Sequence, residues 1–282
     1  MTEPMILRAR VGAPLAAVHR ALTDAGALRT WLAEHAEVDL PHRWVFWGRY
    51  TPEGDAPHQR LLHLDEHTLR FGWLLDGEET TTEVRLTAED DHTTKITVSQ
   101  THFDLQEALA GTTIRGVLQT FWCLSIANLI DYLEGRELTP MCDFTSQTLR
   151  TELTIGAGRS AVYESLIDAE QVTRWFGVPM EIEPRVGGAW SMVDHGGAKI
   201  VDLVHDTRVS LDWGEGFGVQ TWELAESGGG TKLTFVHSGF KDKPPYAGWM
   251  GTLSGFAELR RFHEISNWEP VWLSTPATER LS

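Results

Sequence analysis

The sequence contains two copies of one pattern, about 140 residues apart, and this duplication limits the possible architectures. Residues 11–32 align without a gap with residues 155–176, and eight of the 22 aligned positions are identical. The identical pairs are Gly12/Gly156, Ala13/Ala157, Ala17/Ala161, Val18/Val162, Leu22/Leu166, Asp24/Asp168, Ala25/Ala169 and Trp31/Trp175. Similar segments follow in the same order, and Trp122 then falls on Trp249. Because the period exceeds that of solenoids and propellers, we predict a duplicated globular domain with one core per copy.

The domain boundaries follow from this alignment and from the position of the prolines. We expect a first domain over residues 1–136, a linker over 137–148, a second domain over 149–266 and a C-terminal tail over 267–282. Pro140 lies in the expected linker, and Pro270 and Pro276 lie in the expected tail.

Charge and composition exclude several classes of partner. The chain has 24 Lys and Arg against 40 Asp and Glu, a formal net charge of -16, which disfavours nucleic acid as a partner. The longest strongly apolar stretch, Phe121–Ile130, is about half the length that a membrane span needs. No basic segment followed by an apolar run opens the chain, so we expect a cytoplasmic protein. Two cysteines cannot form a disulfide framework or a four-thiolate zinc site.

Within each copy the order of signals is a strand, a helix, several strands and a long helix. Residues 38–103 are rich in Trp, Val, Thr and Phe and are interrupted by turn residues, of which Asp76-Gly77 is the clearest hairpin signal. The second copy repeats this arrangement with glycine clusters between its strands. A broad apolar face from Ile114 to Leu133, and a similar one from Trp249 to Phe262, predict long helices that lie across a sheet.

The repeated residues resemble a known family. In the first copy they are Ala13–Val18, Ala21–Asp24 and Trp31, and in the second they are Ala157–Val162, Leu166–Ala169, Trp175-Phe176, Gly187–Trp190, His237–Phe240 and Gly248-Trp249. This pattern resembles the START-like or SRPBCC helix-grip superfamily, in the branch of the C-terminal domain of the activator of heat-shock protein 90 ATPase. The resemblance implies an α+β fold of two tandem helix-grip domains. In each, a curved antiparallel sheet would wrap around a long C-terminal helix, with two short helices and an apolar cavity between sheet and long helix.

The alternation of side chains along the predicted strands nominates residues that line these cavities. In the second copy they are Trp190, Met192, Leu211, Trp213, Gln220, Trp222, Phe235 and His237 from strands, with Trp249 and Leu253 from the long helix. In the first copy they are Phe71, Trp73, Val84, Val98, Gln100 and Trp122. Twelve tryptophans suit a pocket for a flat apolar ligand, and simple core packing is the alternative for each ring.

His237 is the one candidate for acid–base chemistry, because it ends an otherwise apolar inward face. A hydrogen-bonded structural histidine is the alternative. Gln100 stands at the matching position of the first copy, and Gly187-Gly188 has no clean counterpart there, so we expect the second copy to hold the working pocket.

The other histidines predict neither a metal site nor a catalytic pair. His58, His63, His67 and His102 lack the spacing of metal ligands, and Asp194-His195 is typical of a turn. We therefore expect no metal and no cofactor.

Three functions from different classes remain open. The first is binding of a hydrophobic small molecule or lipid in the cavity, with the second domain favoured. The second is a polyketide aromatase or cyclase that uses the same cavity, and the third is a co-chaperone module; both follow from the resemblance. Whether the chain is an enzyme stays open. The oligomeric state stays open as well, with a monomer favoured because the duplication supplies an internal pseudo-dimer.

Overall fold

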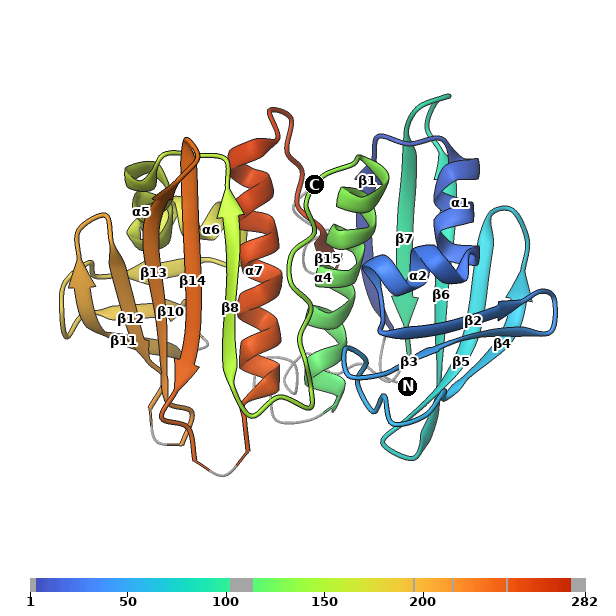
Figure 1. The fold of residues 1–282 in the computed structure, drawn as a ribbon, viewed down its shortest axis with the longest axis horizontal. Coiled ribbons are helices and arrows are strands. Elements are labelled where there is room, and N and C mark those ends of the chain that lie inside the picture. The colour runs from blue at the N-terminus through green and yellow to red at the C-terminus, as the bar shows by residue number, and fades with distance from the viewer. Residues whose placement is uncertain (1–3, 102–113, 195, 215, 242, 275–282) are drawn as a thin grey trace. The chain divides into compact units, whose positions relative to one another are not determined.

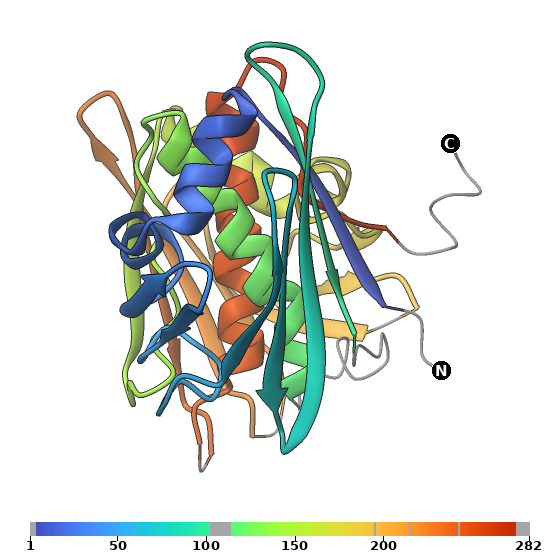
Figure 2. The same ribbon diagram turned by 90° about the vertical axis from the view of Figure 1, so that its right-hand side faces the viewer.

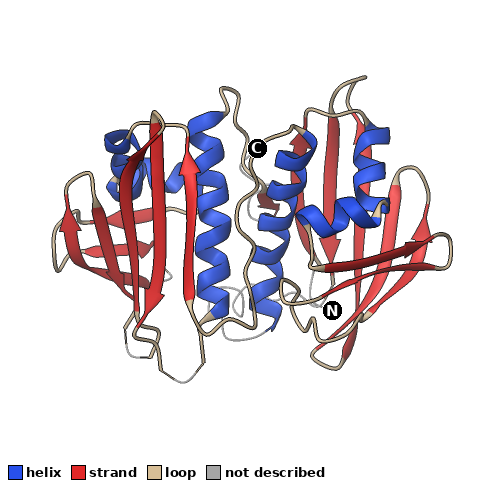
Figure 3. Cartoon of the chain, in the orientation of Figure 1, coloured by secondary structure: helices blue, strands red, loops and turns tan. Residues whose placement is uncertain are grey.

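The structure, a computed structural model, describes residues 4–101, 114–194, 196–214, 216–241 and 243–274. It divides into two compact units, one formed by Met1–Thr145 with Val271–Ser282 and the other by Ser146–Pro270 (Figure 1). Each unit is an antiparallel sheet packed on one long helix and two short helices, which confirms the predicted α+β helix-grip architecture (Figure 3). Among the described helices, none has both the length and the hydropathy to cross a bilayer.

The first unit is built from residues near both ends of the chain. Its elements are β1 (Met5–Val11), α1 (Leu15–Thr23), α2 (Ala25–Trp31), β2 (His35–Asp39), β3 (Arg43–Trp47), β4 (Gln59–Leu64), β5 (Thr68–Leu75), β6 (Glu78–Ala88), β7 (Thr94–Gln100), α4 (Ile114–Leu133) and β15 (Trp272–Ser274). The main sheet has the order β15-β1-β7-β6-β5-β4, and β2 and β3 form a separate hairpin. The long helix α4 packs against β1, α1 and α2 (Figure 2). The C-terminal strand β15 covers the outer edge of β1, pairing with Ile6–Arg8.

The second unit repeats this plan in a single sheet. Its elements are β8 (Leu149–Ile155), α5 (Arg159–Ile167), α6 (Ala169–Phe176), β9 (Met180–Ile182), β10 (Ala189–Met192), β11 (Gly196–Val204), β12 (Arg208–Asp212), β13 (Val219–Ser227), β14 (Gly230–Ser238) and α7 (Tyr246–Glu264). All seven strands join in the order β8-β14-β13-β12-β11-β10-β9. The helix α7 packs against β8 and α6.

The duplication seen in the sequence recurs in the capping of the short helices. The carboxylate of Asp24 accepts the backbone N–H of Ala27 at 2.7 Å, and that of Asp168 accepts the N–H of Gln171 at 2.9 Å. Both aspartates are therefore N-caps, which explains why this residue is identical in the two copies.

The long helices are tied to the first strands in the same way in both units. Glu134 near the end of α4 accepts the backbone N–H of Gly12 at 2.7 Å, and Glu264 at the end of α7 accepts the N–H of Gly156 at 2.7 Å. The indole N–H of Trp31 donates to the carbonyl of Ala21, and that of Trp175 donates to the carbonyl of Ser165. The two units thus share specific hydrogen bonds as well as their topology.

Each sheet bends at a matching irregularity. The pairing of β4 with β5 shifts at Leu62, and the pairing of β11 with β12 shifts at Val201. Such bulges increase the local twist of a strand, so both sheets can curve around their long helix.

The units differ most in their connections between strands. In the first unit, residues 48–58 separate β3 from β4. There the side-chain oxygen of Gln59 accepts the backbone N–H of Phe46 at 3.1 Å. In the second unit the matching strands, β10 and β11, are instead joined by a continuous ladder of backbone pairs. The predicted hairpin at Asp76-Gly77 is present, with φ of 53° and 74° at these residues. The matching connection of the second unit runs from Trp213 to Gly218 and is held by the bond from the Trp213 N–H to the Gly218 carbonyl.

Candidate functional site

The predicted lining residues of the second unit share the inner face of its sheet. Gln220 lies opposite Leu211 on one side and opposite His237 on the other, and Trp222 lies opposite Phe235. Cross-strand partners project to the same face, so these side chains converge toward α7. Most of the predicted set is buried, and only Met192 and Trp213 are partly exposed. The set that the sequence nominated is therefore one surface, whose exposed end is at Trp213 and Met192.

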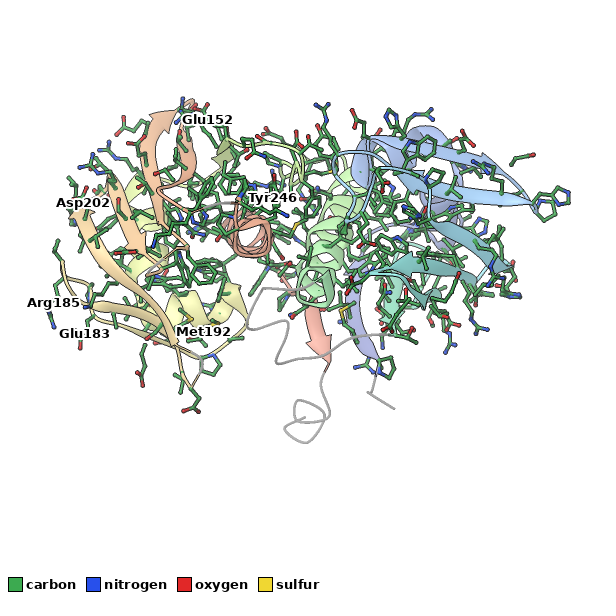
Figure 4. All side chains as sticks on the ribbon, turned by 90° about the horizontal axis from the view of Figure 1, so that it is seen from below. Glu152, Glu183, Arg185, Met192, Asp202 and Tyr246 are labelled. Atoms are coloured by element: carbon green, nitrogen blue, oxygen red, sulfur yellow. The ribbon has the colours of Figure 1, made fainter. Side chains whose placement is uncertain are left out.

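Aromatic rings cover most of this surface. The Trp190 ring lies edge-on to Trp222 and Trp213, with ring centroids 5.6 and 6.1 Å apart. From α7, Trp249 stacks on Phe235 at 4.2 Å, and Leu253 is fully buried. Figure 4 shows this dense packing of side chains between sheet and helix, with Tyr246 at the start of α7.

One inner residue of α7, Phe256, was predicted as part of the apolar helix face but was not nominated as a lining residue. Its ring contacts Trp222 at 5.5 Å and Phe235 at 5.3 Å. It lies one helical turn beyond Leu253 and was part of the predicted apolar face of the helix, so its spacing was a usable signal.

A chain of polar groups crosses this apolar surface. A ring nitrogen of His237, Nε2, is 2.7 Å from the carbonyl oxygen of Phe217 and donates to it, since a carbonyl only accepts. The other ring nitrogen, Nδ1, is 3.4 Å from the side-chain amide of Gln220, whose oxygen accepts the hydroxyl of Thr252 at 3.1 Å. Burial lowers the pKa of His237 below its usual value, so the ring is neutral at pH 7. Both nitrogens of the catalytic candidate are thus engaged by the protein.

The matching surface of the first unit is closed by its own side chains. The predicted residues Phe71, Trp73, Val84, Val98, Gln100 and Trp122 are all buried, with exposed fractions of 0–2%. The side-chain oxygen of Gln100 accepts the hydroxyl of Thr82 at 2.7 Å and the indole N–H of Trp122 at 3.0 Å, and its amide donates to Thr80 at 3.0 Å. Both the oxygen and the nitrogen of the Gln100 side chain therefore have hydrogen-bond partners inside the core.

Trp44 of the first unit is a further residue that the sequence analysis missed. Its indole N–H donates to the carbonyl of Leu22 at 2.8 Å, just as that of Trp190 donates to the carbonyl of Leu166 at 3.0 Å. Trp44 is therefore the counterpart of Trp190. The alignment could have found it, but the different turns on either side of this strand obscured the match.

Three buried indole N–H groups have no acceptor in the described part of the chain, those of Trp73, Trp213 and Trp222. A buried donor that gives up water without gaining a partner costs about 1–3 kcal/mol. Two of the three belong to the inner face of the second unit.

A pocket of about 510 Å³ lies beside the exposed end of that inner face. It is lined by Glu183, Gly187, Ala189, Gly197, Ala198, Lys199, Asp212, Trp213 and Gly214. Ala189, Lys199 and Asp212 are successive cross-strand partners and alternate with the inward Trp190 and Ala198, so they project from the outer face of the sheet. Figure 4 shows Glu183 projecting outward from the same sheet. Apart from Trp213, the pocket uses none of the residues that the sequence nominated.

The histidines that the sequence analysis set aside lie at the surface of the first unit, His63 in β4 and His58 and His67 beside it. His58, His63 and His67 each lie within 3.2 Å of a neighbouring carboxylate oxygen, and the described residues contain no group of His, Cys, Asp and Glu side chains able to hold a metal ion. Asp194 has a φ of 64°, as expected for a turn. His195 and His102 lie outside the described residues.

Comparison with known proteins places this geometry in a family. The family model described as "Activator of Hsp90 ATPase homolog 1-like protein" matches residues 12–134 and again residues 157–260. A search of curated proteins found no match.

Several solved structures are similar. DynU16, a protein in the dynemicin biosynthetic locus, is 18% identical over 92% of this chain and 97% of its own, with a TM-score of 0.38. CalU16 from Micromonospora echinospora is 22% identical over 47% of this chain and 74% of its own, with a TM-score of 0.37. An HSP90 activator from Plasmodium falciparum is 19% identical over 34% of this chain and 77% of its own, with a TM-score of 0.29.

Proposed function

Because the chain belongs to the family of activator of Hsp90 ATPase homolog 1-like proteins, whose fold carries ligand-binding and cyclase-like domains, we propose that its second unit binds a hydrophobic small molecule. The ligand would lie on the inner face of the sheet, between β12, β13, β14 and α7. The first unit would then be a structural partner with a closed core.

The difference between the two inner faces carries this proposal. Trp73 in the first unit is fully buried, and four aromatic rings lie with their centroids within 6.4 Å of its own. Trp213, at the matching position of the second unit, is partly exposed and borders the 510 Å³ pocket. An apolar ring surface that reaches solvent at one end is typical of a small-molecule site.

The geometry of His237 favours binding over the cyclase alternative. A general acid or base must reach its substrate with a free ring nitrogen. Both nitrogens of His237 contact protein groups, Phe217 and Gln220, so the residue is suited to positioning these groups. The co-chaperone alternative rests on the family resemblance, and no side-chain arrangement described above favours it.

The proposal is tested with pyrene, an apolar fluorescent probe that accepts energy from tryptophan. We expect saturable binding of one pyrene per chain, with an affinity that falls at least tenfold in the Trp213→Ala variant. The matched control is Trp47→Ala, which removes a partly exposed tryptophan of the first unit and leaves the affinity unchanged. Absence of saturable binding, or equal loss in both variants, would show that the second unit does not hold the ligand.

A further inference from the structure

We infer that the ligand of the second unit is a neutral, flat molecule with a hydrogen-bond acceptor, of the ketone or quinone class, and that Trp213 and Trp222 donate their indole N–H groups to it. This inference rests on the proposed binding function and specifies the chemistry of its ligand. It starts from two buried donors on the inner face that find no acceptor among the described residues.

Apart from Trp73 in the first unit, the other buried indole N–H groups of the described residues have acceptors. The indoles that donate to a protein oxygen belong to Trp31, Trp44, Trp122, Trp175, Trp190 and Trp268. Unpaired buried donors are rare in folded proteins and need an explanation. Trp222 is 1% exposed, so bulk water does not supply the missing acceptor.

The two unpaired donors belong to one region. The rings of Trp213 and Trp222 both lie against the ring of Trp190, at 6.1 and 5.6 Å between centroids. Trp222 is specific to the second unit, because Val84 occupies the matching position in the first. The third unpaired indole, Trp73, belongs to the first unit, where the rings of Phe121 and Trp122 lie against it.

The other polar groups of this surface are already paired with one another. Gln220 uses its amide toward His237 and its oxygen toward Thr252, and His237 uses its remaining nitrogen toward Phe217. The groups left over are therefore N–H donors, and the complementary ligand group is an acceptor. The predicted lining set of the second unit contains no Asp, Glu, Lys or Arg, so nothing in it compensates the burial of a charged ligand.

The experiment compares two probes that differ only in the acceptor. Fluorene and 9-fluorenone have the same ring skeleton, and only the second carries a carbonyl. We expect the intact protein to bind 9-fluorenone at least tenfold more tightly than fluorene. In the Trp222→Phe variant, which replaces the indole by a smaller aromatic ring without a donor, 9-fluorenone should lose about tenfold more affinity than fluorene does.

The control variant is Trp73→Phe, which removes the unpaired donor of the first unit and should change neither affinity. Circular dichroism and thermal melting of each variant establish that it is folded before its affinity is interpreted. The infrared carbonyl stretch of bound 9-fluorenone should move to lower frequency, and this shift should shrink in Trp222→Phe. Equal binding of both probes, or equal 9-fluorenone affinity in the intact protein and Trp222→Phe, would overturn the acceptor inference and leave the binding function in place. Failure of fluorene, 9-fluorenone and pyrene alike would overturn the binding function itself.

Discussion

Replacing Gln100 with methionine tests whether the first core is held closed by its internal polar network. Methionine has nearly the same length and volume as glutamine, so the Gln100→Met variant changes hydrogen bonding more than packing. The glutamine oxygen is the acceptor for both Thr82 and Trp122. Thr80 keeps a partner in the variant, because its hydroxyl also donates to the carbonyl of Trp73 at 2.7 Å.

The structure sets the magnitude of the effect. Two buried donors lose their acceptor, and each costs about 1–3 kcal/mol, so the free energy of unfolding of the first unit should fall by about 4 kcal/mol. For a unit of this size, roughly 3 °C of melting temperature corresponds to each kcal/mol. We therefore expect the melting temperature of the first unit to fall by about 12 °C. Adding Thr82→Val removes one of the two orphaned donors and should recover about half of the loss.

Hydrogen exchange measured by mass spectrometry assigns the effect to a unit. Backbone amides of β6 and β7 should exchange faster in Gln100→Met, and those of β13 and β14 should exchange as in the parent protein. A loss of less than about 1 kcal/mol, or no recovery with Thr82→Val, would refute the reasoning that these donors depend on Gln100.

Two further predictions concern the stability of the units. Burial lowers the pKa of His237 and His263, both in the second unit, so the unfolded state binds protons at higher pH than the folded state does. The second unit should therefore lose stability as the pH falls below about 6.5. Thermal melts between pH 5 and 8 measure this dependence, and a melting temperature that rises as the pH falls would contradict it. Glu134→Ala and Glu264→Ala each remove the acceptor of one backbone N–H at 2.7 Å, so each should destabilise its own unit by about 1 kcal/mol, and urea unfolding followed by hydrogen exchange should show similar losses in the two units.

The duplication predicted much of the fold because it paired residues that occupy equivalent positions in the two sheets. Placing Gln100 over His237 implied a common strand register, and both residues indeed lie opposite the matching positions Thr82 and Gln220. Strand alternation then placed the nominated side chains on inner faces, since side-chain direction follows from the period of the strand.

Strand alternation could not predict whether the interior of each unit is a filled core or a cavity. Whether a tryptophan fills a core or lines a cavity depends on rings from distant segments, such as Phe46 against Trp73 and Phe256 against Trp222. The outer pocket at Lys199 and its neighbours depends on the pairing of three strands, which no local pattern specifies.

The comparison of the two copies shows how one fold can support two different interiors. At the position of Gln100, an amide with two donors and one acceptor oxygen joins Thr80, Thr82 and Trp122 in a single buried network. At the position of His237, an imidazole instead joins Gln220 to the carbonyl of Phe217, in the connection after Trp213, and the indole N–H groups of Trp213 and Trp222 have no acceptor among the described residues. A buried N–H donor is stabilised by any acceptor that reaches it. The acceptor can therefore come from the protein core, as in the first unit, or from a bound ligand, as proposed for the second. A Trp222→Val variant, which copies the residue of the first unit, should therefore weaken 9-fluorenone binding, and the cavity that it leaves beside Trp190 and Phe256 should also lower the melting temperature of the second unit.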